Sequence, residues 1–171
     1  PLELYHNRGL ILTLAKNDFK TKYAGSYLGI VWAFIQPIVT IMVYWFVFTV
    51  GLKAGDMAEY PFVLYLISGI VPWFFFQDAL NAGTNGLIEY NYLVKKVVFK
   101  ISILPMVKVI SALFVHVFFV AFALVVCAAN GYPPTIHTIQ IIYYTGCTFV
   151  FSLALVYITS ACLLYTSPSP R

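Results

Sequence analysis

Long apolar blocks alternate with short polar segments along this chain. Four blocks, at about 28–52, 61–80, 105–129 and 138–164, are almost free of charged residues. Each block has the roughly 20 residues that a helix needs to cross a hydrocarbon core of about 30 Å. The pattern therefore predicts an all-α integral membrane protein, a polytopic helical bundle with four spans. Pro37 lies inside the first block, where we expect a kink, because neighbouring helices can satisfy the carbonyl that proline frees.

The segment before the first block, residues 1–24, has a helical rather than a continuous apolar pattern. Leu4, Ile11, Ala15 and Phe19 recur at steps of seven and four residues, which places them on one helical face. The other faces carry charge on Arg8, Lys16, Asp18, Lys20 and Lys22. A basic amphipathic helix ahead of a span predicts an interfacial helix; an ordinary solvated helix is the alternative.

Composition agrees with a membrane location. The chain of 171 residues is 61% hydrophobic and 9% charged, whereas soluble domains are about 45–50% apolar and 25% charged. Its net charge of +4 would favour a nucleic-acid partner in a soluble protein, but basic residues in membrane proteins mark the cytoplasmic side. Most lysines lie in the N-terminal segment and near the connection at 84–104, while the other two connections contain Lys53. We therefore predict a cytoplasmic N-terminus.

The connection at 85–104, between the second and third blocks, is long and basic. Helix connections in bundles usually take 2–8 residues. Tyr92, then Lys95 or Lys96, then Phe99 or Lys100 recur at helical spacing. We expect a short helix at the cytoplasmic membrane surface.

Polar side chains continue from the second block into this connection. Asp78, Asn81, Asn85 and Glu89 follow one another at steps of three and four residues, so they form one stripe if the helix continues beyond the membrane. Such a stripe suits a water-filled vestibule or a contact between subunits. A helix that emerges into the cytoplasm with a solvated face is the alternative.

The third block contains two ionisable residues. A lone histidine such as His116 is more often a hydrogen-bonded packing residue than a proton carrier, although any ionisable group in a span is a functional candidate. Lys108 lies two helical turns earlier, where we expect its long side chain to reach towards the membrane interface.

Aromatic residues are dense in the second block, at Trp73, Phe74, Phe75 and Phe76. Aromatic residues near membrane ends usually anchor a helix at the interface. These four lie deeper, and aromatic faces also stack on sugar rings. Interface anchors and a glycan path are both open interpretations.

Motifs for catalysis, metal binding and ATP binding are absent from the sequence. It has no P-loop pattern, no HExxH pattern and no His, Cys or Asp cluster at metal-ligand spacing. Its three cysteines contain no CxxC pair. We therefore predict no catalytic residue, no metal site and no cofactor in this chain.

Two stretches carry a family resemblance. The first, at 17–48, has a basic segment and then the pattern Y-x-x-S-x-L-G-x-x-W before a proline, formed by Tyr23, Ser26, Leu28, Gly29, Trp32 and Pro37. The second, at 72–105, includes a Leu-Val-Lys-Lys segment and the S-x-L-P that opens the third block. Together they resemble the permease subunits of type-2 bacterial polysaccharide ABC exporters, the O-antigen and teichoic-acid export family, over about residues 8–160.

The resemblance implies a function and partners. Such a permease has six spans, pairs with a second copy and binds two cytoplasmic ATPase subunits, which hold ATP and Mg²⁺. It moves a lipid-linked polysaccharide across the bacterial cytoplasmic (inner) membrane. The implied contact with the ATPase is a coupling helix that contains Glu89, Tyr92, Lys95, Lys96 and Lys100. The candidate substrate path contains Trp73, Phe74, Phe76, Asp78, Asn81 and Asn85.

The C-terminal end of the sequence departs from the family pattern, because it closes on Ser-Pro repeats. The chain starts with proline rather than methionine, so we expect a truncated start. We expect residues 1–161 to form a single transmembrane domain and residues 162–171 to be a non-native tail, with two further spans in the intact protein. Alternatives to polysaccharide export are a type-2 permease for drugs or another lipid, a membrane-bound transferase and a membrane scaffold.

Overall fold

The computed structural model describes residues 8–24, 29–53, 60–89 and 103–166. The elements in these ranges are all helical: α2 (Arg8–Ala24), η1 (Gly29–Val31), α3 (Trp32–Phe46), η2 (Val47–Gly51), α4 (Phe62–Glu89), α6 (Ile103–Ala129), η3 (Ile136–Ile139) and α7 (Gln140–Thr166). Within the described residues, four segments are long and apolar enough to cross a membrane: Gly29–Gly51, Phe62–Gly86, Ile103–Ala129 and Ile136–Leu163. The predicted all-α fold with four spans is confirmed.

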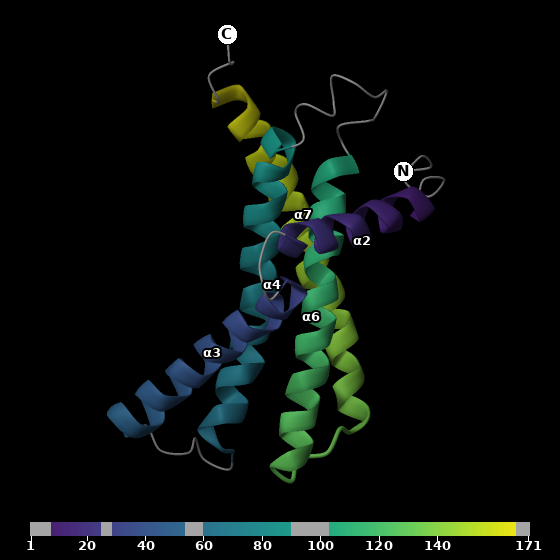
Figure 1. The fold of residues 1–171 in the computed structure, drawn as a ribbon. Coiled ribbons are helices and arrows are strands. Elements are labelled where there is room, and N and C mark those ends of the chain that lie inside the picture. Colours follow the sequence, from purple (N-terminus) through teal and green to yellow (C-terminus); the bar gives the residue numbers. More distant parts are fainter. Residues whose placement is uncertain (1–7, 25–28, 54–59, 90–102, 167–171) are drawn as a thin grey trace.

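Helices α4, α6 and α7 run beside one another and form the body of the molecule (Figure 1). Helix α2 crosses the outside of α6 near the end where α6 begins, and α3 leans away from the other spans. Three hydrophobic clusters hold this arrangement together. The first joins α3, α4 and α6, the second joins α4, α6 and α7, and the third joins α2 to α6.

The outer surfaces of the spanning helices are strongly apolar. Met42 on α3, Val125 on α6 and Ile142 on α7 are each more than 60% exposed. Large apolar surfaces of this kind are unfavourable in water but match the hydrocarbon interior of a bilayer, where the α-helix satisfies its own backbone hydrogen bonds. The exposed faces therefore belong against lipid or against other membrane helices.

Glycine sets how closely α4 approaches its neighbours. A Cβ atom at Gly83 would lie 2.5 Å from Cγ1 of Val156 on α7, and one at Gly86 would lie 3.1 Å from Cγ of Lys108 on α6. Small residues at such contacts let helix backbones pack closely in membranes, where van der Waals contact drives association. The C-terminal part of α4 therefore packs tightly on both sides.

Helix α4 is longer than the span predicted from the sequence. The predicted span ends near Leu80, whereas α4 continues to Glu89 and has 28 residues. At 1.5 Å per residue it is about 42 Å long, which exceeds a hydrocarbon core of about 30 Å. The polar stripe therefore continues on a helix that extends beyond the membrane core.

Candidate functional site

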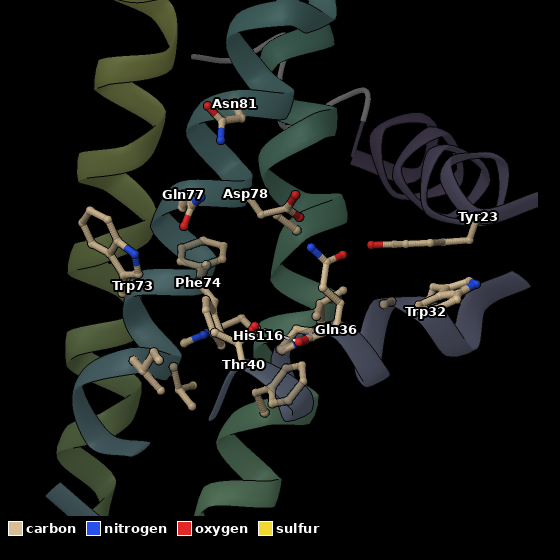
Figure 2. Close-up of a pocket in the computed structure, with 18 of the residues that line it drawn as sticks. Tyr23, Trp32, Gln36, Thr40, Trp73, Phe74, Gln77, Asp78, Asn81 and His116 are labelled. Carbon is tan, nitrogen blue, oxygen red and sulfur yellow. Dashed lines mark hydrogen bonds between the residues drawn. The ribbon is translucent and has the colours of Figure 1, made fainter. Parts of the chain in front are cut away.

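A cavity of about 450 Å³ lies between α3, α4 and α6, and the last turn of α2 closes one side. Its polar lining comes from Tyr23, Gln36, Thr40, Gln77, Asp78, Asn81 and His116. Figure 2 shows Gln36 and Asp78 directed into the space between α3 and α4, with the Tyr23 hydroxyl on the same side. A concave site with a few convergent polar groups is the usual form of a ligand pocket.

Aromatic side chains form much of the remaining wall. Trp32 and Tyr44 come from the α3 side, and Trp73 and Phe74 come from α4. Trp32 is 43% exposed and Trp73 is 57% exposed, so both rings remain available to a ligand. Broad apolar faces can stack on a sugar ring while the neighbouring amide and carboxylate groups form hydrogen bonds with its hydroxyls.

Phe76 differs from the other predicted aromatic residues. Its ring stacks on Phe151 of α7, with ring centroids 5.9 Å apart, and contacts Trp73 at a similar distance. Phe76 does not line the cavity. The structure therefore brings Trp73, Phe74, Asp78 and Asn81 to one cavity and places Phe76 in the packing between α4 and α7.

His116 lies at the inner wall of the cavity, and only 5% of the residue is exposed. Its Nε2 atom is 3.3 Å from the hydroxyl oxygen of Thr145, and its ring lies 4.8 Å from that of Phe75. This environment is typical of a hydrogen-bonded packing residue that joins α4, α6 and α7.

A second cavity, of about 480 Å³, lies beside the first one, and every residue that lines it except Ala82 has a polar or charged side chain. Its lining consists of Asp18, Thr21, Lys22, Asp78, Asn81, Ala82, Asn85 and Lys108. Asp78 and Asn81 line both cavities. Three members of the predicted stripe thus face one shared space, while nothing is described for the side chain of Glu89.

In the part of the chain that the structure describes, two ion pairs attach α2 to the spans. Lys22 Nζ lies 2.5 Å from Asp78 Oδ1 on α4, and Lys108 Nζ on α6 lies 2.7 Å from Asp18 Oδ1. The side chains of Lys108 and Asp18 are only 7% and 5% exposed, whereas those of Lys22 and Asp78 are 36% and 37% exposed. One pair is therefore buried and the other is partly exposed.

The buried pair corrects two expectations from the sequence. We expected Lys108 to extend to the membrane interface and Asp18 to lie on a polar face of the first helix. Instead, Asp18 and Lys108 are each only 6% exposed. Close to them in sequence, Ile11 and Ala15 pack against Ile103 and Val107. Because a buried charge needs a partner, the lysine extends towards Asp18 rather than towards water.

The charges around the last turn of α2 also affect its ionisable side chains. Burial is the strongest single influence on Lys22 and favours the neutral amine, but the charge and hydrogen bond of Asp78 outweigh it, so the pKa of Lys22 is raised. Burial raises the pKa of the Tyr23 hydroxyl as well. Lys22 is therefore cationic near neutral pH, and the Tyr23 hydroxyl is neutral.

The family-pattern residues gather around the first cavity. Tyr23, Trp32 and Pro37 line it. Gly29 has a φ of +53° at the start of η1, a left-handed conformation that is costly for residues with a Cβ atom. This conformation gives a physical reason for glycine in the pattern. Ser26 lies outside the described residues.

The predicted ATPase-contact residues fall largely outside the described part of the chain. Tyr92, Lys95, Lys96 and Lys100 are in the segment between α4 and α6 that is not described, and Glu89 is the last residue of α4. Their role therefore stays a prediction.

Sequence reasoning missed three polar residues of the first cavity: Gln36, Thr40 and Gln77. Gln36 and Thr40 lie one turn apart on α3, where the Thr40 hydroxyl donates a hydrogen bond to the Gln36 carbonyl at 2.9 Å. A glutamine directly before Pro37 in an otherwise apolar span was an available signal. Gln77 directly precedes Asp78, but only the tertiary structure places it in the same cavity as residues of α3.

Comparison with known proteins gives relatives that share one name. The O-antigen export system permease protein RfbA of Myxococcus xanthus is 32% identical over 159 residues, which are 93% of this chain and 60% of that protein. A protein of the same name from Klebsiella pneumoniae is 27% identical over 113 residues, which are 63% of this chain and 42% of that protein. No family model matches the sequence.

The chain thus spans 60% of the length of the Myxococcus relative and a smaller share of the Klebsiella relative. Together with the four apolar helices, these matches indicate a multi-pass protein of the inner membrane. The resemblance inferred from the sequence is confirmed: this chain is similar to the permease proteins of O-antigen export systems.

Proposed function

We propose that this chain is a membrane-spanning part of an ATP-driven exporter that moves a lipid-linked polysaccharide across the bacterial cytoplasmic membrane. The observation that carries the proposal is the similarity to O-antigen export permeases over 93% of the chain. The cavity between α3, α4 and α6 supports it, because its lining combines exposed aromatic faces with amide and carboxylate groups. Those groups suit a polyhydroxylated ligand.

The proposed exporter contains two copies of the permease and two ATPase subunits in the cytoplasm. ATP and Mg²⁺ bind to the ATPase subunits, and the chain itself transports rather than catalyses. In this proposal the 85–104 connection transmits ATPase movement to α4 and α6, the two helices that it joins.

Deletion of the gene in its native bacterium tests the proposed function. We expect polysaccharide to disappear from the cell surface and to accumulate inside the cell on its lipid carrier, and we expect the wild-type gene to reverse both changes. Unchanged surface polysaccharide, with loss of export of a drug or another lipid, would instead support the alternative permease function.

Complementation of that deletion with two matched variants tests the cavity. Trp32 and Trp45 are both on α3 and are 43% and 42% exposed, but Trp32 lines the cavity and Trp45 does not. Trp32→Ala is expected to reduce export several-fold at equal membrane abundance, while Trp45→Ala exports normally. Equal export by the two variants would argue against a substrate path through this cavity.

Cysteine crosslinking tests the contact with the ATPase. Lys96→Cys is expected to crosslink to a co-expressed ATPase subunit in membranes. Lys53→Cys, which lies in the connection predicted to be on the opposite side, is the control and is expected to stay free. Failure of Lys96→Cys in a folded exporter would remove the proposed coupling role of this segment.

A further inference from the structure

The second, polar cavity adjoins the first one where Asp78 and Asn81 line both. Lys22 lies at this junction, because it lines the second cavity and forms its ion pair with Asp78. Any movement of Lys22 away from Asp78 therefore changes the boundary between the two spaces. The junction lies towards the end of α4 that is predicted to be cytoplasmic.

The two ion pairs of α2 differ in how easily they separate. Asp18 and Lys108 are buried, and breaking a buried pair leaves uncompensated charge in a poor solvent. Lys22 and Asp78 are more than one-third exposed, so water replaces their contact at little cost. Asp18 and Lys22 are one turn apart on the same face of α2. The buried pair can therefore hold α2 in place while the last turn moves.

The last turn of α2 also carries part of the cavity wall. Tyr23 follows Lys22 and lines the first cavity, and the Lys22 ammonium lies 5.6 Å from the centre of the Tyr23 ring. Gly29, with its φ of +53°, follows a few residues later and leads into α3. A displacement of this turn would move Lys22 and Tyr23 together.

We propose that the Lys22–Asp78 ion pair is a gate between the second, polar cavity and the first cavity, which has the aromatic wall and is called the aromatic cavity below. The Asp18–Lys108 pair is the fixed anchor of this gate. With the gate closed, Lys22 and Tyr23 separate the aromatic cavity from the cytoplasmic side. With the gate open, the last turn of α2 moves off Asp78 and the two cavities join. The inference rests on the proposed function and deepens it, because it names the ion pair that controls access to the proposed substrate path.

Access to a cysteine in the aromatic cavity tests the gate directly. The exporter carries Thr40→Cys in a background where Cys127, Cys147 and Cys162 are replaced by alanine, and inside-out vesicles receive a membrane-impermeant maleimide. Labelling is expected to be slow with the native ion pair and several-fold faster with Lys22→Ala or with Asp78→Asn. Lys16→Ala, an exposed charge on the same helix, is the matched control and keeps the slow rate.

Ionic strength separates a gate from a general loosening of the fold. The Debye length falls from ~30 Å at 0.01 M salt to ~3 Å at 1 M, and exposed pairs are screened more than buried ones. Salt is therefore expected to accelerate labelling in the parent protein but to have no effect in Lys22→Ala. Equal labelling rates in Lys22→Ala and the parent, or a salt response that persists in Lys22→Ala, would overturn the gate. The assay measures no export, so its failure leaves the proposed function intact, and loss of the proposed function leaves the labelling result valid.

Discussion

At the residue scale, the two ion pairs of α2 show that burial matters more than distance. The pairs have similar separations, 2.5 Å and 2.7 Å. A solvent-exposed surface pair contributes about 0–1 kcal/mol to stability, while loss of one partner from a buried pair costs about 3–5 kcal/mol. The same chemical contact therefore serves as a permanent attachment in one place and as a separable contact in the other.

This difference predicts the effect of removing Lys108. Lys108→Met takes the lysine partner from the buried Asp18 carboxylate, so we expect the free energy of unfolding to fall by about 3–5 kcal/mol. The apparent melting temperature in detergent provides the measurement. The double variant Lys108→Met with Asp18→Leu is expected to recover most of the loss, because it removes both charges. Lys16→Met, at an exposed position on α2, should change little, and equal melting temperatures for Lys16→Met and Lys108→Met would contradict the burial argument.

At the element scale, close packing of α4 on α7 depends on the missing side chain of Gly83. A Cβ atom there would approach Cγ1 of Val156 within 2.5 Å, so one of the two helices would have to move. The same helix carries Gly69, where a Cβ atom meets nothing within 4 Å. The two glycines therefore form a matched pair that differs in packing.

Gly83→Ala is expected to destabilise the protein by about 1–3 kcal/mol, the usual cost of overpacking. Gly69→Ala should be neutral or stabilising by up to ~1 kcal/mol, because alanine favours helix more than glycine does. Thermal unfolding of each variant in detergent provides the comparison. Val156→Ala should offset part of the Gly83→Ala cost in a double-mutant cycle. If the changes in the free energy of unfolding caused by Gly83→Ala and Val156→Ala were simply additive, these two residues would not control this contact.

At the scale of the whole molecule, the distribution of lysines predicts the orientation in the membrane. Lys20 on α2 and Lys53 after η2 are both exposed and lie on opposite sides in this prediction. Cysteines at these positions, in the cysteine-free background, are expected to react with an impermeant reagent from opposite faces. Lys20→Cys should react in inside-out vesicles, and Lys53→Cys should react in intact cells or spheroplasts. The reverse pattern would invert the predicted topology. The polar cavity would then lie towards the outer side of the membrane and not towards the cytoplasm.

Much of the architecture follows from the sequence because its signals are local. An apolar block long enough to cross the bilayer predicts its own helix, whatever lies around it. The four spans were predictable in this way, and the helix at α2 was predictable from apolar residues at helical spacing. The polar stripe of Asp78, Asn81 and Asn85 was also predictable, since α4 continues past the predicted span and keeps their helical spacing.

The sequence by itself determined the membrane class, the number of spans in this chain and the family resemblance, because each depends on neighbouring residues. Only the tertiary structure decided that Lys108 is buried against Asp18, that Lys22 meets Asp78 and that Gln36 shares a cavity with Asn81. Those residues are far apart in the chain, and their burial depends on how α2 and α3 pack against the other helices. The energy of a charge or an amide is set by that packing, which no local pattern contains.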